Sequence, residues 1–205
     1  MERHLRDDGT PPISGLLLLY PLLQLVNYRL ASYRTYLPYR LLSIFREDIL
    51  TNVVNFYLNT SFAQTDLFDN RHLSLDDIET FHAKLHVSLS DEDKAHDRAF
   101  ASTLSHPDTW QLFDVNVSPL LADDDILRRS PPTLIVACTY DVLLSDTQLY
   151  YRRLQQLNVP DVTYREYRIF HGVMPFLDPP VAFDEAFKML YESAQFVVNR
   201  TRTEG

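Results

Sequence analysis

Glycine is scarce in this chain, and its scarcity limits which enzymes these residues can form by themselves. The 205 residues contain 4 glycines, Gly9, Gly15, Gly172 and Gly205, whereas average proteins contain about 7%. Nucleophile turns and phosphate loops need glycine, because their backbone adopts positive φ or approaches a ligand closely. The two nearest glycines, Gly9 and Gly15, are six positions apart (15 − 9), which is too far for G-x-S-x-G, for G-x-G-x-x-G or for a P-loop.

Composition and charge further restrict which class of protein this chain can be. A chain with 45% hydrophobic and 23% charged residues is long enough for one globular domain with a core. Its net charge is -9 and it has no basic run, so we expect no nucleic-acid partner. The charged Met1–Gly9 stretch is not a signal peptide, and the apolar Leu16–Tyr20 stretch is far short of the roughly 20 residues of a membrane span. These residues alone therefore predict a cytoplasmic location.

Three apolar runs predict the strands of a parallel sheet. Ile13–Tyr20 is apolar on both faces and reads as a central buried strand. Thr133–Cys138 follows a Pro-Pro break, and the single Cys138 within it reads as a buried, inert thiol. Val162–Tyr167 is rich in β-branched and aromatic residues. Helical patterns alternate with the last two runs, which is typical of an α/β fold with covering helices.

The helical patterns have identifiable starts and apolar faces. The first helix is expected over 43–58, and a second is expected to begin after an N-cap at Ser74. A third should run from a cap at Ser145 or Asp146 to about Leu157, and the last should cover 182–198. The charged 91–98 stretch reads as a solvated helix face or loop. The expected apolar faces are Phe45, Ile49, Val53 and Phe56 for the first helix, Leu149, Arg153 and Leu157 for the third, and Phe183, Phe187, Leu190 and Ala194 for the last.

An acid and a histidine follow two neighbouring strands of the predicted sheet. Asp141 comes after the strand over 133–139, and His171 comes after the strand over 162–167. Catalytic groups in such sheets lie at the carboxyl ends of strands. An acid there can orient an imidazole that acts as a general base, and Gly172 suits a tight loop beside the ring. By spacing alone, a turn aspartate and a surface histidine are the more common interpretation of such a pair.

Three stretches of this sequence resemble one group of α/β-hydrolases, the arylacetamide deacetylase and hormone-sensitive-lipase-like esterases. They are S-P-L-L-A-D-D at 118–124, P-P-T-L-I-V-A-C-T-Y-D-V-L at 131–143, and F-H-G at 170–172. The group uses a serine nucleophile, an acid in a Y-D-x-L-x-x-D stretch and a histidine in an H-G turn. The resemblance places Asp141 on the acid, Asp146 on the second aspartate and His171 on the base.

The resemblance is strong over 113–176 and implies a division of the chain. The expected fold is α/β, a partial α/β-hydrolase with a mostly parallel sheet, covering helices and a helical cap-side region. Residues 1–205 would be the C-terminal part of such a domain, with 22–112 as the cap-side region and 113–205 as the sheet region that bears the acid and the histidine. The group's H-G-G-G oxyanion loop and G-D-S-A-G-G elbow have no counterpart here, so its serine would lie upstream.

Two functions are implied by this resemblance. The first is hydrolysis of a small carboxylic ester or arylamide without metal or organic cofactor, with these residues inactive by themselves because they lack the serine. The alternative is a non-catalytic truncated isoform that acts as a binding or regulatory fragment. A sheet that begins midway exposes an unpaired strand edge, so self-association is expected. A longer parent could be anchored in the endoplasmic reticulum membrane, as members of the group are.

Other histidines and short motifs carry less weight. His82 and His86 are four residues apart, a spacing that can ligate zinc. Ala83 follows His82, so H-E-x-x-H is absent, and surface polar residues are the better interpretation for both and for His72. Glycosylation sequons start at residues 59, 116 and 199, and they matter only in a secretory protein.

Overall fold

The computed structural model describes residues 13–38, 46–174, 177 and 182–201, and its centre is a parallel sheet. The strands lie in the order β1-β2-β3 within this part of the chain. They are β1 (Leu16–Leu19), β2 (Thr133–Tyr140) and β3 (Val162–Phe170). The α/β prediction is confirmed, but β1 is an edge strand of the described sheet and not a central one. It is half-buried along its length.

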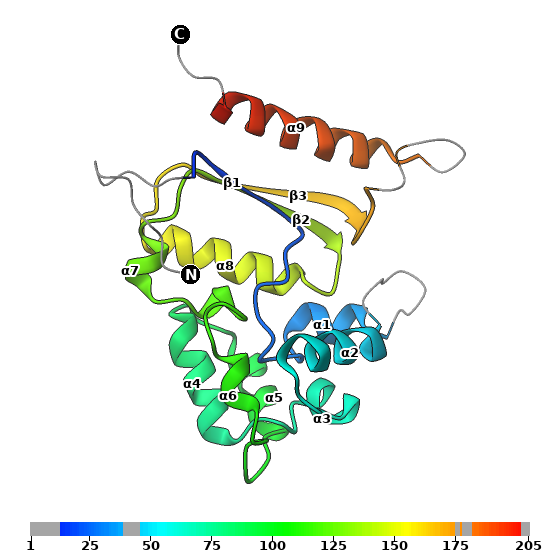
Figure 1. Ribbon diagram of the computed structural model, residues 1–205, viewed down its shortest axis with the longest axis vertical. Coiled ribbons are helices and arrows are strands. Elements are labelled where there is room, and N and C mark those ends of the chain that lie inside the picture. The colour runs from blue at the N-terminus through cyan, green and yellow to red at the C-terminus, as the bar shows by residue number, and fades with distance from the viewer. Residues whose placement is uncertain (1–12, 39–45, 175–176, 178–181, 202–205) are drawn as a thin grey trace.

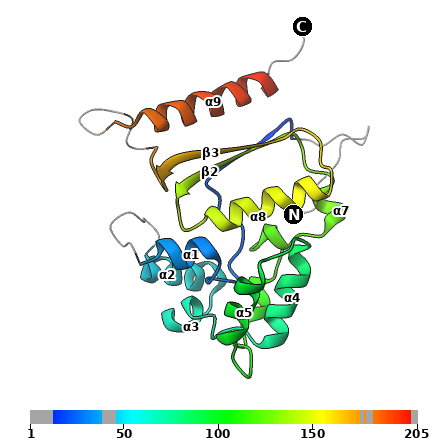
Figure 2. The ribbon, with the colours of Figure 1, turned by 180° about the vertical axis from the view of Figure 1, so that it is seen from behind.

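Helices cover both faces of the sheet. Helix α8 (Leu144–Gln156) lies on one face and α9 (Asp184–Thr201) lies on the other (Figures 1 and 2). Side chains alternate between the two faces, as they do in any strand. Leu18 and Ile135 pack in the core beside α8, whereas Leu17 and Val136 pack in the core beside α9. Cys138 is fully buried on the α9 side, so its predicted burial is confirmed, and this burial raises its pKa to about 12.

A helical region lies beyond α8, on the side of the molecule away from α9 (Figure 1). It shares one hydrophobic core with the α8 face of the sheet. Its elements are α1 (Ala31–Tyr36), α2 (Glu47–Leu58), α3 (Gln64–Phe68), α4 (Leu75–Leu85), α5 (Asp91–Ala99), α6 (Thr109–Leu112), the 3-10 helix η1 (Pro119–Leu121) and α7 (Asp124–Leu127). The predicted N-cap at Ser74 is confirmed as a capping box with Asp77.

Two predicted helix faces are wrong. In α2 the buried residues are Leu50, Thr51 and Val54, while Ile49, Val53 and Phe56 are exposed; residues 43–45 lie outside the described part of the chain. In α9 the buried residues are Ala186, Met189 and Ser193, while Phe187, Leu190 and Ala194 are exposed. Of the predicted face only Phe183, directly before the helix, packs against the core. In both helices the buried stripe lies directly beside the predicted one. Both stripes carry apolar residues, so helical spacing fits either of them.

Helix α8 also begins differently from the prediction. Its N-cap is Leu143, so neither Ser145 nor Asp146 caps it, and both lie in the first turn. The predicted face of α8 is confirmed, since Leu149 and Arg153 are buried. Among the described residues, none of the helices is both long and apolar enough to cross a bilayer.

Candidate active site

Asp141 and His171 meet at the carboxyl end of the sheet. Tyr140 of β2 pairs with Phe170 of β3, so the residues that come directly after them lie side by side. The Nδ1 atom of His171 lies 2.8 Å from Oδ2 of Asp141. Asp141 is 2% exposed and His171 is 9% exposed, so the contact is shielded from water. The register of β2 and β3 thus brings together the two residues that the sequence singled out.

The other carboxylate oxygen of Asp141, Oδ1, also accepts a hydrogen bond. The backbone N–H of Leu143 donates to Oδ1 at 2.9 Å, and the N–H of Leu144 donates to the Asp141 carbonyl at 3.2 Å. These bonds form the turn that leads into α8. Because a carboxylate can only accept, the 2.8 Å contact assigns the proton to Nδ1 of His171. The basic lone pair of the imidazole is then on Nε2, as a general base requires.

The loop after β3 has the backbone expected beside a projecting histidine. Gly172 has φ 72°, the left-handed region that glycine enters without steric cost. The expectation that Gly172 provides a tight loop is therefore confirmed.

Tyr20 is a neighbour of the site that the sequence analysis missed. It follows β1, and its ring centroid lies 4.5 Å from that of His171 with an interplanar angle of 63°. Its φ is 37°, which is uncommon for a residue other than glycine. The one signal in the sequence is its place at the end of a strand, directly before Pro21.

Asp146 fastens the segment after β1 to α8. Its carboxylate accepts from the backbone N–H of Leu23 at 3.3 Å, from Nε2 of Gln24 at 3.1 Å and from the hydroxyl of Tyr33 at 3.3 Å. Asp146 is fully buried, and this burial raises its pKa to about 7. The second aspartate of the family pattern is therefore a buried anchor between distant segments.

The helical region is also fastened directly beside the site. Ser32 of α1 donates its hydroxyl to the carbonyl of Val142 at 2.5 Å and accepts from the N–H of Ser145 at 2.9 Å. The hydroxyl of Ser145 in turn accepts from the N–H of Ser32 at 3.0 Å. Val142 follows Asp141, so α1 is held against the turn that carries the acid.

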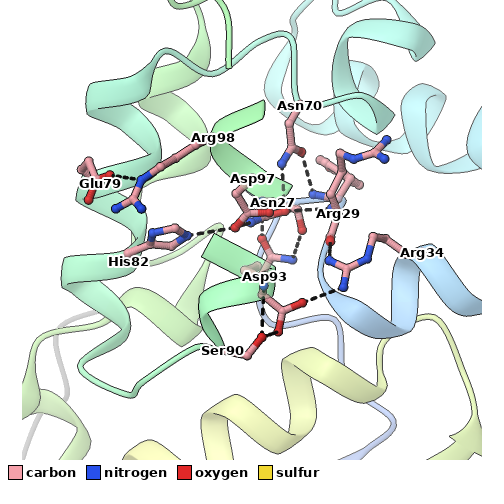
Figure 3. Close-up of polar contacts among 12 residues, drawn as sticks. Asn27, Arg29, Arg34, Asn70, Glu79, His82, Ser90, Asp93, Asp97 and Arg98 are labelled. Carbon is pink, nitrogen blue, oxygen red and sulfur yellow. Dashed lines mark hydrogen bonds and ion pairs between the residues drawn. The ribbon is translucent and has the colours of Figure 1, made fainter. Parts of the chain in front are cut away.

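A second Asp–His contact lies inside the helical region. Figure 3 shows His82 of α4 and Asn27 pointing at Asp97 of α5. Nε2 of His82 lies 2.9 Å from Oδ2 of Asp97, and Nδ2 of Asn27 donates to the same oxygen at 2.8 Å. Asp97 is 1% exposed, so the 91–98 stretch is not wholly a solvated face. This contact joins three chain segments away from the strand ends.

The surface interpretation is wrong for two of the three histidines. His72 is 1% exposed, and each of its ring nitrogens lies 2.9 Å from a backbone carbonyl oxygen. The His82 side chain is 9% exposed, whereas the His86 side chain is 53% exposed and contacts Asp124. The described residues hold no group of three or more histidine, cysteine, aspartate or glutamate side chains suited to a metal ion.

Comparison with known proteins finds esterases. A family model described as the alpha/beta hydrolase fold matches residues 79–174. Arylacetamide deacetylase from Bos taurus is 32% identical over 178 residues, which cover 82% of this chain and 43% of that protein. Arylacetamide deacetylase-like 3 from Mus musculus is 31% identical, covering 82% and 42%. Neutral cholesterol ester hydrolase 1 from Bos taurus is 28% identical, covering 81% and 42%. The chain thus spans less than half the length of these relatives.

Solved structures agree on the fold. A thermostable esterase from Pseudomonas putida superimposes with a TM-score of 0.55 at 17% identity. The match covers 97% of this chain and 46% of that one. At this identity the likeness concerns the fold alone.

Proposed function

The chain belongs to the α/β-hydrolases of the arylacetamide deacetylase group, and on that premise we propose that it is the acid- and histidine-bearing part of a serine carboxylesterase. The observation that carries the proposal is the 2.8 Å contact between Asp141 and His171 at adjacent strand ends. The group's chain order, with the acid before the histidine, agrees with it.

Each member of the pair has one role in this proposal. Asp141 orients the imidazole through Nδ1–H and stabilises the imidazolium. Nε2 of His171 takes the proton of a serine hydroxyl while the serine oxygen attacks the acyl carbonyl. His171 then gives that proton to the departing alcohol or amine. In the second half, Nε2 takes a proton from the water that attacks the acyl-enzyme. It then returns this proton to the serine oxygen as the bond to the acyl group breaks, which releases the acid and restores the serine.

We propose a small-molecule carboxylic ester or arylamide, of unspecified acyl size, as substrate of the parent protein. The relatives support this class, because their names describe the deacetylation of arylacetamides and the hydrolysis of cholesterol esters. The cap-side assignment of residues 22–112 belongs to the same proposal. It is supported by the position of α1, which is held against the Asp141 turn by Ser32.

These 205 residues by themselves are proposed to be inactive. They contain no G-x-S-x-G, and a triad without its nucleophile loses nearly all triad-dependent rate. This observation also favours a second candidate, a non-catalytic fragment that binds or regulates. The unpaired edge of β1 in the described sheet supports self-association of such a fragment. Gel filtration tests this point, and a single peak at 23.9 kDa would contradict it.

The mass of the native polypeptide distinguishes the two candidate functions. An antibody raised against residues 160–205 captures it from its source, and its intact mass is measured. The esterase proposal expects a mass well above 23.9 kDa and hydrolysis of p-nitrophenyl acetate that is lost in His171→Ala. A mass near 23.9 kDa favours the fragment. Hydrolysis by the parent that survives His171→Ala overturns the esterase mechanism.

A further inference from the structure

We propose that Tyr20 is a positioning residue for His171, and that its ring holds the imidazole in the plane that faces Asp141. The consequence for catalysis rests on the proposed esterase function. The structural part does not, because it concerns only the orientation of one ring.

The place of Tyr20 in the sheet brings its ring to the site. β2 lies between β1 and β3, and neighbouring strands are about 4.8 Å apart. Tyr20 follows β1 and His171 follows β3, yet their ring centroids are only 4.5 Å apart. The two side chains therefore reach toward each other over the end of β2, where Asp141 begins its turn.

The backbone of Tyr20 is held in an uncommon conformation. Its φ of 37° is a left-handed conformation that a residue with a Cβ adopts at a cost. Its N–H donates to the carbonyl of Val136 at 2.7 Å, which ties Tyr20 to β2. Pro21 favours extended backbone in the residue before it, so it adds to the cost of this conformation. The chain leaves β1 here while the ring stays beside His171.

The contacts with Asp141 and Tyr20 act on different features of the imidazole's orientation. The Asp141 carboxylate holds one ring atom, Nδ1, and a hydrogen bond at one atom does not by itself fix the plane of the ring. A tilted aromatic neighbour limits rotation of that plane. Burial and the charges of Cys138 and Asp141 raise the pKa of the Tyr20 phenol, so the ring beside the imidazole stays neutral.

Three variants of the chain distinguish the effect of the Tyr20 ring from the effect of its hydroxyl and from a general loosening of the fold. Tyr20→Gly removes the ring at a position whose φ suits glycine, so the backbone is preserved. Tyr20→Phe keeps the ring and removes the hydroxyl. Tyr151→Leu is the matched control, because Tyr151 stacks on Tyr164 at 4.9 Å, between α8 and β3.

The readout is the exchange with water of the His171 Nδ1 proton, followed by proton NMR in ¹⁵N-histidine-labelled chain. We expect slow exchange in the wild type, in Tyr20→Phe and in Tyr151→Leu, and at least about tenfold faster exchange in Tyr20→Gly, because the ring then leaves Asp141 more often. Unchanged exchange in Tyr20→Gly overturns the proposal. So does equally fast exchange in Tyr151→Leu, which would indicate general loosening. Should Tyr20→Gly unfold, Tyr20→Leu is measured in its place against the same two outcomes.

In the parent protein, Tyr20→Gly is expected to lower kcat for p-nitrophenyl acetate about tenfold or more with KM unchanged, because orientation of the base matters in the transition state. Tyr20→Phe retains the wild-type kcat. If hydrolysis does not depend on His171 at all, the esterase proposal fails, while the proton exchange still decides the role of Tyr20.

Discussion

His171 and Asp141 are joined by a 2.8 Å contact, and the pairing of Tyr140 with Phe170 places the two residues side by side. If the proposed parent esterase is correct, Asp141→Asn in it should lower kcat about 10³- to 10⁴-fold, because an amide no longer selects the Nδ1–H tautomer. KM should change little. The measurement is steady-state hydrolysis of a chromogenic ester.

The control for this variant is Asp125→Asn, which removes a carboxylate whose side chain is 86% exposed. It should leave kcat unchanged. The double variant Asp141→Asn/His171→Ala should be no slower than His171→Ala, since the two residues act as a unit. Additive losses would show that Asp141 acts elsewhere.

Asp146 should make stability depend on pH. Burial raises its pKa to about 7, whereas an unfolded carboxyl has a pKa near 4. Between about pH 4 and pH 7 the folded chain retains a proton that the unfolded chain has released, so the contribution of Asp146 to the unfolding free energy falls as the pH rises. The slope approaches about 1.4 kcal/mol per pH unit and vanishes above about pH 7.

Urea unfolding between pH 4.5 and 8 measures this effect as the difference between wild type and Asp146→Asn. The variant lacks the titrating group, so its stability should fall less across the interval. The exposed Asp125→Asn should follow the wild-type curve. Parallel curves for wild type and Asp146→Asn would place the Asp146 pKa near its ordinary value.

Removing Asp124 should destabilise the chain more than removing Arg153, although the two side chains form one ion pair. Nη2 of Arg153 lies 2.7 Å from Oδ1 of Asp124, and the two side chains are 1% and 24% exposed. Asp124→Ala leaves a buried guanidinium without its carboxylate and should cost about 3 kcal/mol or more. Arg153→Met leaves a carboxylate that water can reach and fills the space with apolar atoms, so it should cost about 1–2 kcal/mol. Urea unfolding of both variants measures the order, and the reverse order would contradict the burial of Arg153.

The sheet and the Asp141–His171 pair could be predicted because both depend on local patterns. β2 and β3 are short apolar or β-branched runs with clear breaks, and two parallel neighbours bring their carboxyl ends to the same edge of the sheet. The contacts of Asp146 and Tyr20 could not be predicted in this way. Asp146 meets Leu23 across 123 positions in the chain, and no spacing rule connects residues so far apart.

The helix faces failed for a different reason. Periodicity identifies a stripe only when the opposite side is polar. In α2 the pattern offers Leu50 and Val54 as readily as Ile49 and Val53. In α9 Ala186, Met189 and Ser193 face inward, while the equally apolar Phe187 and Leu190 of the neighbouring stripe remain outside. Helical spacing alone therefore did not distinguish the buried stripe from its neighbour in either helix.

The corrected face of α2 gives a direct test. Leu50 is 1% exposed and packs in the core of the helical region, so Leu50→Ala should cost about 2–5 kcal/mol. Phe56 lies in the same helix and is 92% exposed, so Phe56→Ala should stay within about 0.5 kcal/mol of the wild type. Both variants are compared by urea unfolding at one pH. If Phe56→Ala costs as much as Leu50→Ala, the outer stripe of α2 is covered in solution, because only a side chain removed from water loses that much when it is truncated.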